Sequence, residues 1–318
     1  MKIVIDVSVY QNTYTFEQFK LLINNGVAGV IIRAGAAHSE DDMLPTFVSW
    51  CRTLYIPYGL YFYVYPGLGI KYQAELFEML ISEYPDCKSV WIDIEEYKNP
   101  SSGTTYSPDI LNAFYKGVFD YIKAAFPDKI VGNYSGGWVL DSYMKQAWTW
   151  INTAPYWNAA YVKYYSWWHN YMNSLGASWD SDLRQISIAN LSMIMAEIER
   201  HPLVGPAGVV KVSMWQAITF IPFVELSSWQ KHLDYNICND FDLIFGPPAP
   251  PPAPVIGEKD YRIDELKWLR LELDKVNAAS EAERQAFIKA YSAQADADKA
   301  LSDLYAYISR RETLLGKK

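Results

Sequence analysis

Short apolar runs alternate with amphipathic stretches over the first 246 residues of the chain. The apolar runs predict strands at 3–10, 29–35, 58–66, 90–95, 130–134, 156–162 and 210–218. Several runs, such as Gly29-Val30-Ile31-Ile32, are almost continuously apolar, which is typical of parallel strands that are covered on both faces. The stretches between them have the spacing of helices, most clearly at 15–25, 70–83 and 108–126.

This alternation of strands and helices predicts an α/β fold, and over such a length it favours a TIM-like barrel. In such barrels the chemistry lies at the C-terminal ends of the strands. An open, doubly wound sheet is the alternative architecture. It is less favoured because no glycine-rich phosphate loop follows the first strand.

A proline-rich run at 247–256 interrupts the pattern. Prolines at this density adopt extended polyproline geometry and act as a stiff spacer. We therefore expect a barrel over 1–246, a linker over 247–256 and a helical hairpin or coiled-coil segment over 257–318. Apolar residues in the last segment recur at spacings of three and four. Such a seam needs a partner, so we expect a homo-oligomer or an assembly partner there, with a solvated helical tail as the alternative.

The composition narrows the classes of partner and cofactor. A net charge of −8 provides no basic footprint for nucleic acid and disfavours an anionic membrane surface. The three cysteines and four histidines are widely spaced, so the sequence predicts neither a disulfide framework nor a metal site, and no cofactor is expected. No segment reaches the roughly 18 to 20 apolar residues that span a bilayer.

Acidic residues stand at the ends of several predicted strands. Asp93 and Glu95 close the apolar run 90–95, and side chains two apart on a strand point to the same side. Two neighbouring carboxylates do not both ionise easily, so one tends to keep its proton. A glycosidase needs this combination of a protonated acid and an ionised partner. Asp6 ends the first strand in the same way, and Asp234 lies near the presumed last strand.

The motifs that surround these acids resemble, in order, those of glycoside hydrolase family 25, the muramidases of bacteria and phages. The matching segments are Ile5-Asp6-Val7-Ser8, Gly29-Val30-Ile31-Ile32-Arg33-Ala34, Tyr58-Gly59-Leu60-Tyr61-Phe62, Ile92-Asp93-Ile94-Glu95, Tyr156-Trp157-Asn158-Ala159-Ala160-Tyr161, Trp215-Gln216 and Leu233-Asp234-Tyr235-Asn236. The resemblance covers about residues 1 to 246. It implies a barrel with five βα units followed by three further strands.

The resemblance also implies a function and a set of site residues. The expected reaction is hydrolysis of the β-1,4 bond between N-acetylmuramic acid and N-acetylglucosamine in bacterial peptidoglycan, assisted by the N-acetyl group of the substrate. Glu95 matches the family's acid, and Asp93 matches the carboxylate that holds the N-acetyl group. Asp6 and Asp234 match supporting acidic positions. The aromatic residues expected around the sugar are Tyr61, Tyr134, Tyr161 and Trp215.

The sequence departs from the family pattern in three places. Leu44 stands before Pro45-Thr46-Phe47 where an Asp is common, although Asp41 and Asp42 lie just upstream. Tyr61-Phe62-Tyr63 lacks the His that is often found in the middle of the third strand. The aromatic stretch 164–179 resembles an insertion. These departures affect the substrate subsites and leave the acid pair intact.

Two other functions stay open. A chitinase-like glycosidase also has Asp-x-Glu on its fourth strand, but its longer motif wants an acid where this chain has Trp91. A catalytically inactive barrel that binds glycan or builds a phage or injection apparatus is the alternative from another class. Because Met1-Lys2 leads directly into a strand, we expect no secretory signal, synthesis in the cytoplasm and delivery to the wall as a phage endolysin or tail-associated lysin.

Overall fold

The computed structural model describes residues 2–99, 102–144, 147–161, 165–174, 191–201, 205–220 and 233–246. The chain divides into two units, 1–248 and 249–318, and every described residue lies in the first unit. The expected linker at 247–256 and the expected helical segment at 257–318 lie outside the described residues. Those two domain assignments therefore stay predictions.

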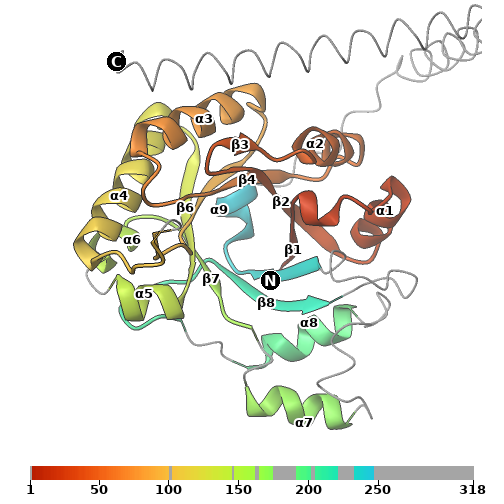
Figure 1. Ribbon diagram of the computed structural model, residues 1–318. Coiled ribbons are helices and arrows are strands. Elements are labelled where there is room, and N and C mark those ends of the chain that lie inside the picture. Colours follow the sequence, from red (N-terminus) through yellow and green to blue (C-terminus); the bar gives the residue numbers. More distant parts are fainter. Residues whose placement is uncertain are drawn as a thin grey trace, which may run out of the picture. The chain divides into compact units, whose positions relative to one another are not determined.

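The described strands form a closed barrel in a mixed α/β fold (Figure 1). Its eight staves are β1 (Lys2–Val7), β2 (Val27–Ala36), β4 (Tyr58–Tyr63), β5 (Ser89–Asp93), β6 (Ile130–Gly136), β7 (Tyr156–Ala159), β8 (Met214–Phe220) and β9 (Leu233–Cys238). They follow the order β1-β9-β8-β7-β6-β5-β4-β2, and β1 also pairs with β2, which closes the sheet. β9 runs antiparallel to both neighbours, whereas the other staves pair in parallel. The short strand β3 (Ser39–Glu40) extends β2 as a hairpin.

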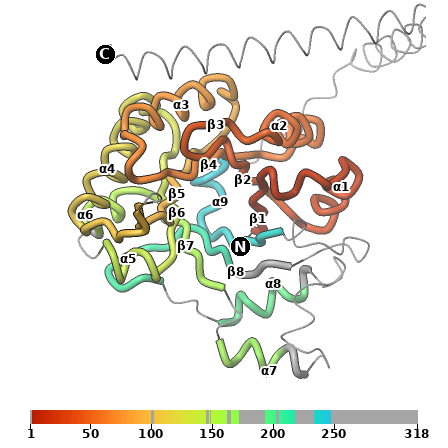
Figure 2. Tube along the Cα trace, viewed as in Figure 1, coloured from red at the N-terminus to blue at the C-terminus, as the bar shows by residue number. Residues whose placement is uncertain are grey.

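Helices follow the first five staves along the chain and pack outside them (Figures 1 and 2). They are α1 (Phe16–Asn24), α2 (Leu44–Thr53), α3 (Ile70–Glu83), α4 (Pro108–Ala125) and α5 (Gly137–Tyr143). The shorter helical elements are η1 (Val9–Gln11), α6 (Trp148–Ile151), α7 (Ser166–Ser174), α8 (Leu191–Glu199) and α9 (Phe241–Phe245). Five βα units followed by three strands confirm the predicted architecture. Helix α7 occupies the described part of the aromatic insertion, and α8 follows it before β8.

Alternation along the staves divides the core into two parts. On β5, Val90 and Ile92 point outward and join the apolar layer under the helices. Trp91 points inward and packs edge-to-face on Trp157, with ring centroids 5.8 Å apart. The N-terminal end of the barrel is filled by α9, whose Phe245 contacts Gly29 so closely that a Cβ there would lie 2.9 Å from its ring. Apolar side chains thus fill the interior at this end, and the strand-end acids line a pocket at the opposite end, where the parallel staves have their C-terminal ends.

Several predicted strands end earlier in the structure than their apolar runs. The first one stops at Val7 because Ser8 begins a 3-10 turn, where its side chain accepts a hydrogen bond from the Tyr10 N–H. Gln11 completes this capping box by accepting from the Ser8 N–H at 2.8 Å. The turn moves residues 8 to 11 off the sheet and over the C-terminal end of the barrel.

Candidate functional site

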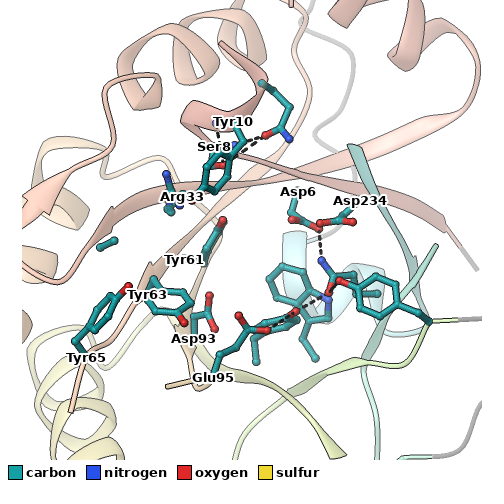
Figure 3. Close-up of a pocket in the computed structure, with 16 residues that line it drawn as sticks. Asp6, Ser8, Tyr10, Arg33, Tyr61, Tyr63, Tyr65, Asp93, Glu95 and Asp234 are labelled. Carbon is teal, nitrogen blue, oxygen red and sulfur yellow. Dashed lines mark hydrogen bonds between the residues drawn. The ribbon is translucent and has the colours of Figure 1, made fainter. Parts of the chain in front are cut away.

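A pocket of about 500 Å³ opens at the C-terminal ends of the staves (Figure 3). Every stave of the barrel, or the loop that follows it, contributes a side chain to its walls. The lining residues are Asp6, Ser8, Tyr10, Gln11, Arg33, Ala36, Tyr61, Tyr63, Tyr65, Asp93, Glu95, Tyr134, Trp157, Tyr161, Gln216 and Asp234. The pocket therefore brings together all four predicted acids and three of the four predicted aromatic residues.

Asp93 and Glu95 both enter this pocket, as the two-residue spacing predicts. Asp93 is the last residue of β5, and the backbone after it stays tied to β6. The Ile94 N–H donates to the Tyr134 carbonyl oxygen at 2.8 Å, and the Ile94 carbonyl accepts from Ser135 Oγ at 2.6 Å. These bonds continue the extended geometry past the end of the strand, so Glu95 emerges on the same side as Asp93.

The environment of Glu95 suits a proton donor. Burial in the pocket wall raises its pKa to about 7, and the negative charges of Asp234 and Glu96 add to the rise. The Tyr134 hydroxyl donates to Glu95 Oε1 at 3.2 Å, which lowers the pKa and limits the rise. A carboxyl group with this pKa holds a proton near neutral pH and can also release it.

Asp93 is enclosed more completely, with a relative exposure of 3%. Burial raises its pKa well above the usual range, and the neighbouring Glu95 and Asp6 carboxylates raise it further. Its Oδ1 atom is buried without a hydrogen-bond partner among the described residues. A buried, unpartnered carboxylate oxygen is costly, so this atom is suited to accept a donor from a bound ligand.

Asp6 and Asp234 face each other across the barrel seam, where β1 pairs with β9. Asn236 Nδ2 donates to Asp6 Oδ2 at 2.8 Å, and Gln216 Nε2 donates to the same oxygen at 3.4 Å. Burial and the Asp234 charge nevertheless raise the pKa of Asp6 well above its usual range. The two acids lie on the side of the pocket opposite Asp93 (Figure 3).

Aromatic side chains form the remaining walls. Trp157 lies at the floor, with the Tyr61 ring edge-on at 6.2 Å and the Tyr134 ring at 4.4 Å between centroids. The hydroxyls of Tyr134 and Tyr161 both donate to Gln216 Oε1, at 2.5 and 2.8 Å. Flat apolar faces combined with fixed hydroxyl groups are what a pyranose ring requires from its binding site.

Trp215 does not line the pocket, which corrects one sequence prediction. It packs on the apolar layer outside the barrel. Neighbouring residues of a strand point to opposite faces, so Gln216 takes the inward position on β8.

Sequence reasoning also missed residues that line the pocket. Ser8, Trp157 and Gln216 stand in the family-like motifs but had no predicted role, and Tyr63 was noted only for the absence of a His beside it. Tyr10 and Tyr65 were not predicted at all. Arg33 carried a usable signal, since it is a charged residue at the end of an apolar run, as Asp6 is.

Two further findings concern metals and membranes. Within the described ranges, no group of three or more His, Cys, Asp or Glu side chains could hold a metal ion. No helix in that part of the chain is long and apolar enough to cross a membrane.

Comparisons with known proteins agree with this geometry. The sequence profile of the glycosyl hydrolases family 25 matches residues 5–180. No curated protein matches the chain.

Three solved structures have a similar fold. A muramidase from Trichobolus zukalii has 15% sequence identity and a TM-score of 0.53, with 78% of this chain and 100% of that chain covered. The bacterial lysozyme from Streptomyces coelicolor has 16% identity and a TM-score of 0.53, with coverage of 76% and 96%. A family 25 glycosyl hydrolase from Bacillus anthracis has 15% identity and a TM-score of 0.51, with coverage of 78% and 94%. At these identities the likeness concerns the fold.

Proposed function

Since the chain belongs to glycosyl hydrolase family 25, we propose that it is an N-acetylmuramidase that cuts peptidoglycan. The bond cleaved is the β-1,4 link between N-acetylmuramic acid and N-acetylglucosamine. The observation that carries the proposal is the acid pair. Glu95, with a pKa of about 7, lies in one pocket with Asp93, whose Oδ1 has no hydrogen-bond partner in the described part of the chain.

Glu95 is the proton donor of the proposed reaction. A sugar oxygen is a poor leaving group, and protonation by a positioned carboxylic acid lowers the barrier to cleavage of the glycosidic bond. Because its pKa is about 7, Glu95 is mostly protonated in mildly acidic solution and partly protonated at neutral pH. After the bond breaks, the same carboxylate takes a proton from the incoming water.

Asp93 is the partner that holds the substrate's N-acetyl group. Its Oδ1 accepts the amide N–H, which directs the acetyl oxygen toward the anomeric carbon. Bound substrate also decides where the proton lies. Positive charge that develops at the anomeric carbon, together with the amide donor, favours the ionised form of Asp93 and leaves the proton on Glu95.

The nucleophile in this scheme is the substrate's acetyl oxygen. Asp93 and Glu95 come from one strand end and lie on the same side of the pocket (Figure 3). Two carboxylates that flank a sugar from opposite faces are the arrangement of a protein nucleophile. The placement of this pair supports the substrate-assisted route.

A wall-clearing assay tests the proposal. Purified peptidoglycan should lose turbidity with the wild-type protein, and mass analysis should show fragments whose reducing end is N-acetylmuramic acid. Fragments that end in N-acetylglucosamine would reassign the bond cleaved, and cleavage of chitin oligomers alone would favour the chitinase-like alternative. Sedimentation of the protein with intact walls, with no fragments released, would favour the inactive barrel.

The biological setting is a separate proposal. Delivery to the wall as a phage endolysin or tail-associated lysin stays a prediction from the sequence. Recovery of the protein from lysing phage-infected cells or from purified virions would support it. Export of the chain by a general secretory route would contradict it.

A further inference from the structure

The walls of the pocket differ in charge. Four carboxylates line it, and Arg33 is the one cationic side chain among the described lining residues. Arg33 lies on β2, where it pairs in register with Tyr61 of β4, and its side chain is 14% exposed. A guanidinium keeps its charge in such a position, so the pocket contains one fixed positive site.

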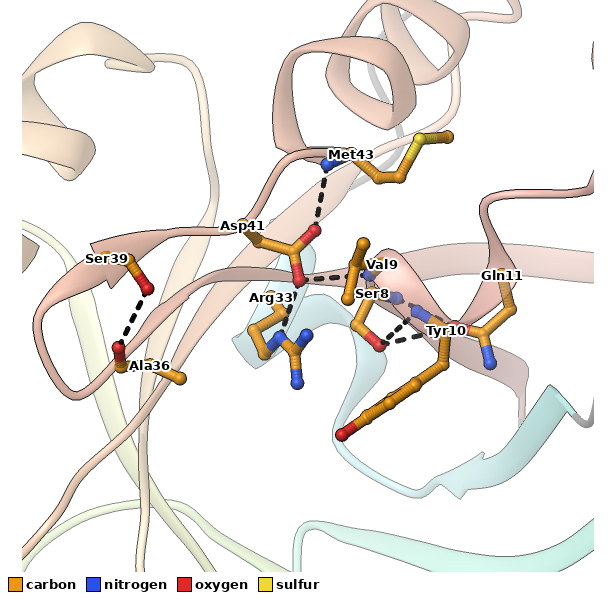
Figure 4. A network of polar contacts seen from close by, with 9 residues as sticks. All are labelled: Ser8, Val9, Tyr10, Gln11, Arg33, Ala36, Ser39, Asp41 and Met43. Carbon is orange, nitrogen blue, oxygen red and sulfur yellow. Dashed lines mark hydrogen bonds and ion pairs between the residues drawn. The ribbon is translucent and has the colours of Figure 1, made fainter. Parts of the chain in front are cut away.

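The buried carboxylate of Asp41 fixes this guanidinium in place (Figure 4). Arg33 Nε donates to Asp41 Oδ2 at 2.6 Å, and the Asp41 side chain is fully buried. Asp41 also accepts the Val9 N–H at 3.0 Å and the Met43 N–H at 2.9 Å. Three donors fix the carboxylate, which in turn fixes the direction of the Arg33 side chain. The Tyr10 ring lies 5.0 Å from the guanidinium carbon and limits its movement further.

The contact with Asp41 uses only part of the guanidinium. Arginine–carboxylate pairs are frequently bidentate, as Arg52 is when its Nε and Nη2 donate to Asp86 at 3.0 and 2.6 Å. Arg33 engages Asp41 through Nε and is also hydrogen-bonded to the Tyr10 side chain, which leaves part of its five N–H donors unused. The terminal nitrogens keep donors for a ligand in the pocket.

We propose that Arg33 binds a carboxylate of the substrate and makes the pocket selective for muramic acid over N-acetylglucosamine. This inference rests on the proposed function. Muramic acid differs from glucosamine by a lactyl ether at O3 that ends in a carboxyl group. That group is free in peptide-stripped glycan, and in intact wall it carries a stem peptide with carboxylates of its own. A chitin chain offers no such anion to a pocket that is otherwise acidic.

Matched substrates measure the selectivity. Peptide-free glycan oligomers with free lactyl carboxylates are compared with the same oligomers after conversion of the carboxylates to methylamides. A charge-assisted bond in a partly dehydrated site is expected to favour the acid form about tenfold to hundredfold in kcat/KM. A second pair, soluble glycan oligomers that carry stem peptides, before and after amidation of the stem carboxylates, shows whether the lactyl group or the stem supplies the anion.

The variant that tests the residue is Arg33→Gln, and the readout is the ratio of the two kcat/KM values. That ratio should fall to about one. Arg33→Lys keeps the positive charge but lacks the planar guanidinium with its paired N–H donors, so an intermediate ratio is expected. This variant serves as the test if Arg33→Gln does not fold. Arg52→Gln is the matched control, because it removes an arginine–carboxylate pair that lies outside the pocket. Its ratio should equal that of the wild type.

The possible failures are distinguishable. If Arg33→Gln and Arg33→Lys lower both rates by the same factor and leave the ratio unchanged, Arg33 acts only through the fold and the inference is overturned. If the wild type cleaves acid and amide forms of both substrate pairs equally well, the inference fails while the muramidase function stands. If the wild type cleaves none of these substrates, the proposed function itself fails.

Discussion

The Tyr134 hydroxyl sets the upper pH limit of the reaction in the mechanism proposed above, and Tyr134→Phe tests this. Glu95 must be protonated to act as the acid, so kcat/KM should fall as pH rises through its pKa of about 7. The hydroxyl of Tyr134, at 3.2 Å from Glu95 Oε1, favours the ionised form and holds that pKa down. Removal of the hydroxyl should therefore raise the pKa and move the alkaline limb to higher pH.

The structure also limits the size of the shift. A hydrogen bond to a charged group is worth about 1.5 kcal/mol or more, and one pKa unit corresponds to about 1.4 kcal/mol. The Tyr134 hydroxyl has a single hydrogen, however, and its 2.5 Å contact to Gln216 is shorter than its contact to Glu95. Because this hydrogen is shared between two acceptors, its removal should move the alkaline limb by about half a pH unit to one pH unit.

The assay is a pH profile of kcat/KM on soluble glycan, because this parameter reports the free enzyme. Tyr121→Phe is the control, since its hydroxyl donates to Glu78 at 2.7 Å and neither residue lines the pocket. Its alkaline limb should coincide with that of the wild type. A limb that stays in place or moves to lower pH in Tyr134→Phe would refute the claim that the Tyr134 hydroxyl holds down the pKa of the catalytic acid.

Three further predictions follow from the same contacts. Glu95→Gln should lower turnover by about 10² to 10⁴ in the turbidity assay and leave the protein folded, whereas Glu96→Gln, outside the pocket, should keep most of the activity. Asp93→Asn should also lose activity but gain stability at pH 7. Burial raises the pKa of Asp93, so the protonated side chain makes its full contribution to stability below pH 4. That contribution is lost as pH rises through the pKa of the folded state. Urea unfolding should show this gain at pH 7 and its disappearance near pH 3. Asp41→Ala should lower the free energy of unfolding by about 3 kcal/mol, because it leaves Arg33 and two backbone N–H groups without their partner. An unfolding midpoint equal to that of the wild type would contradict this.

Local patterns along the chain were enough to predict the barrel and its acid pair. The apolar runs predict strands because parallel staves are covered on both faces, whereas the five βα units before three strands were implied by the resemblance to glycoside hydrolase family 25. The spacing of Asp93 and Glu95 predicts a shared side because alternation is a property of the extended backbone itself. These features depend only on neighbours in the sequence, so they are readable without the fold.

Other features depended on the closure of the barrel. The motif Trp215-Gln216 contains one inward and one outward residue, and only the register of β8 between β7 and β9 shows that Gln216 is the inward one. The hydrogen bond from Arg33 to Asp41 joins a strand to a loop. The three donors that the Asp41 carboxylate accepts come together only in the folded chain.

The chemistry of the site also depends on the closure of the barrel. The sequence by itself determined which residue types stand at the strand ends. Tertiary structure decided that Asp6, Asp93, Glu95 and Asp234 line one pocket, with Arg33 among them. It also decided that burial raises the pKa of Glu95 to about 7. The physical reason is that alternation is local, whereas desolvation and the repulsion between charges depend on every side chain that the closed barrel brings to its C-terminal end.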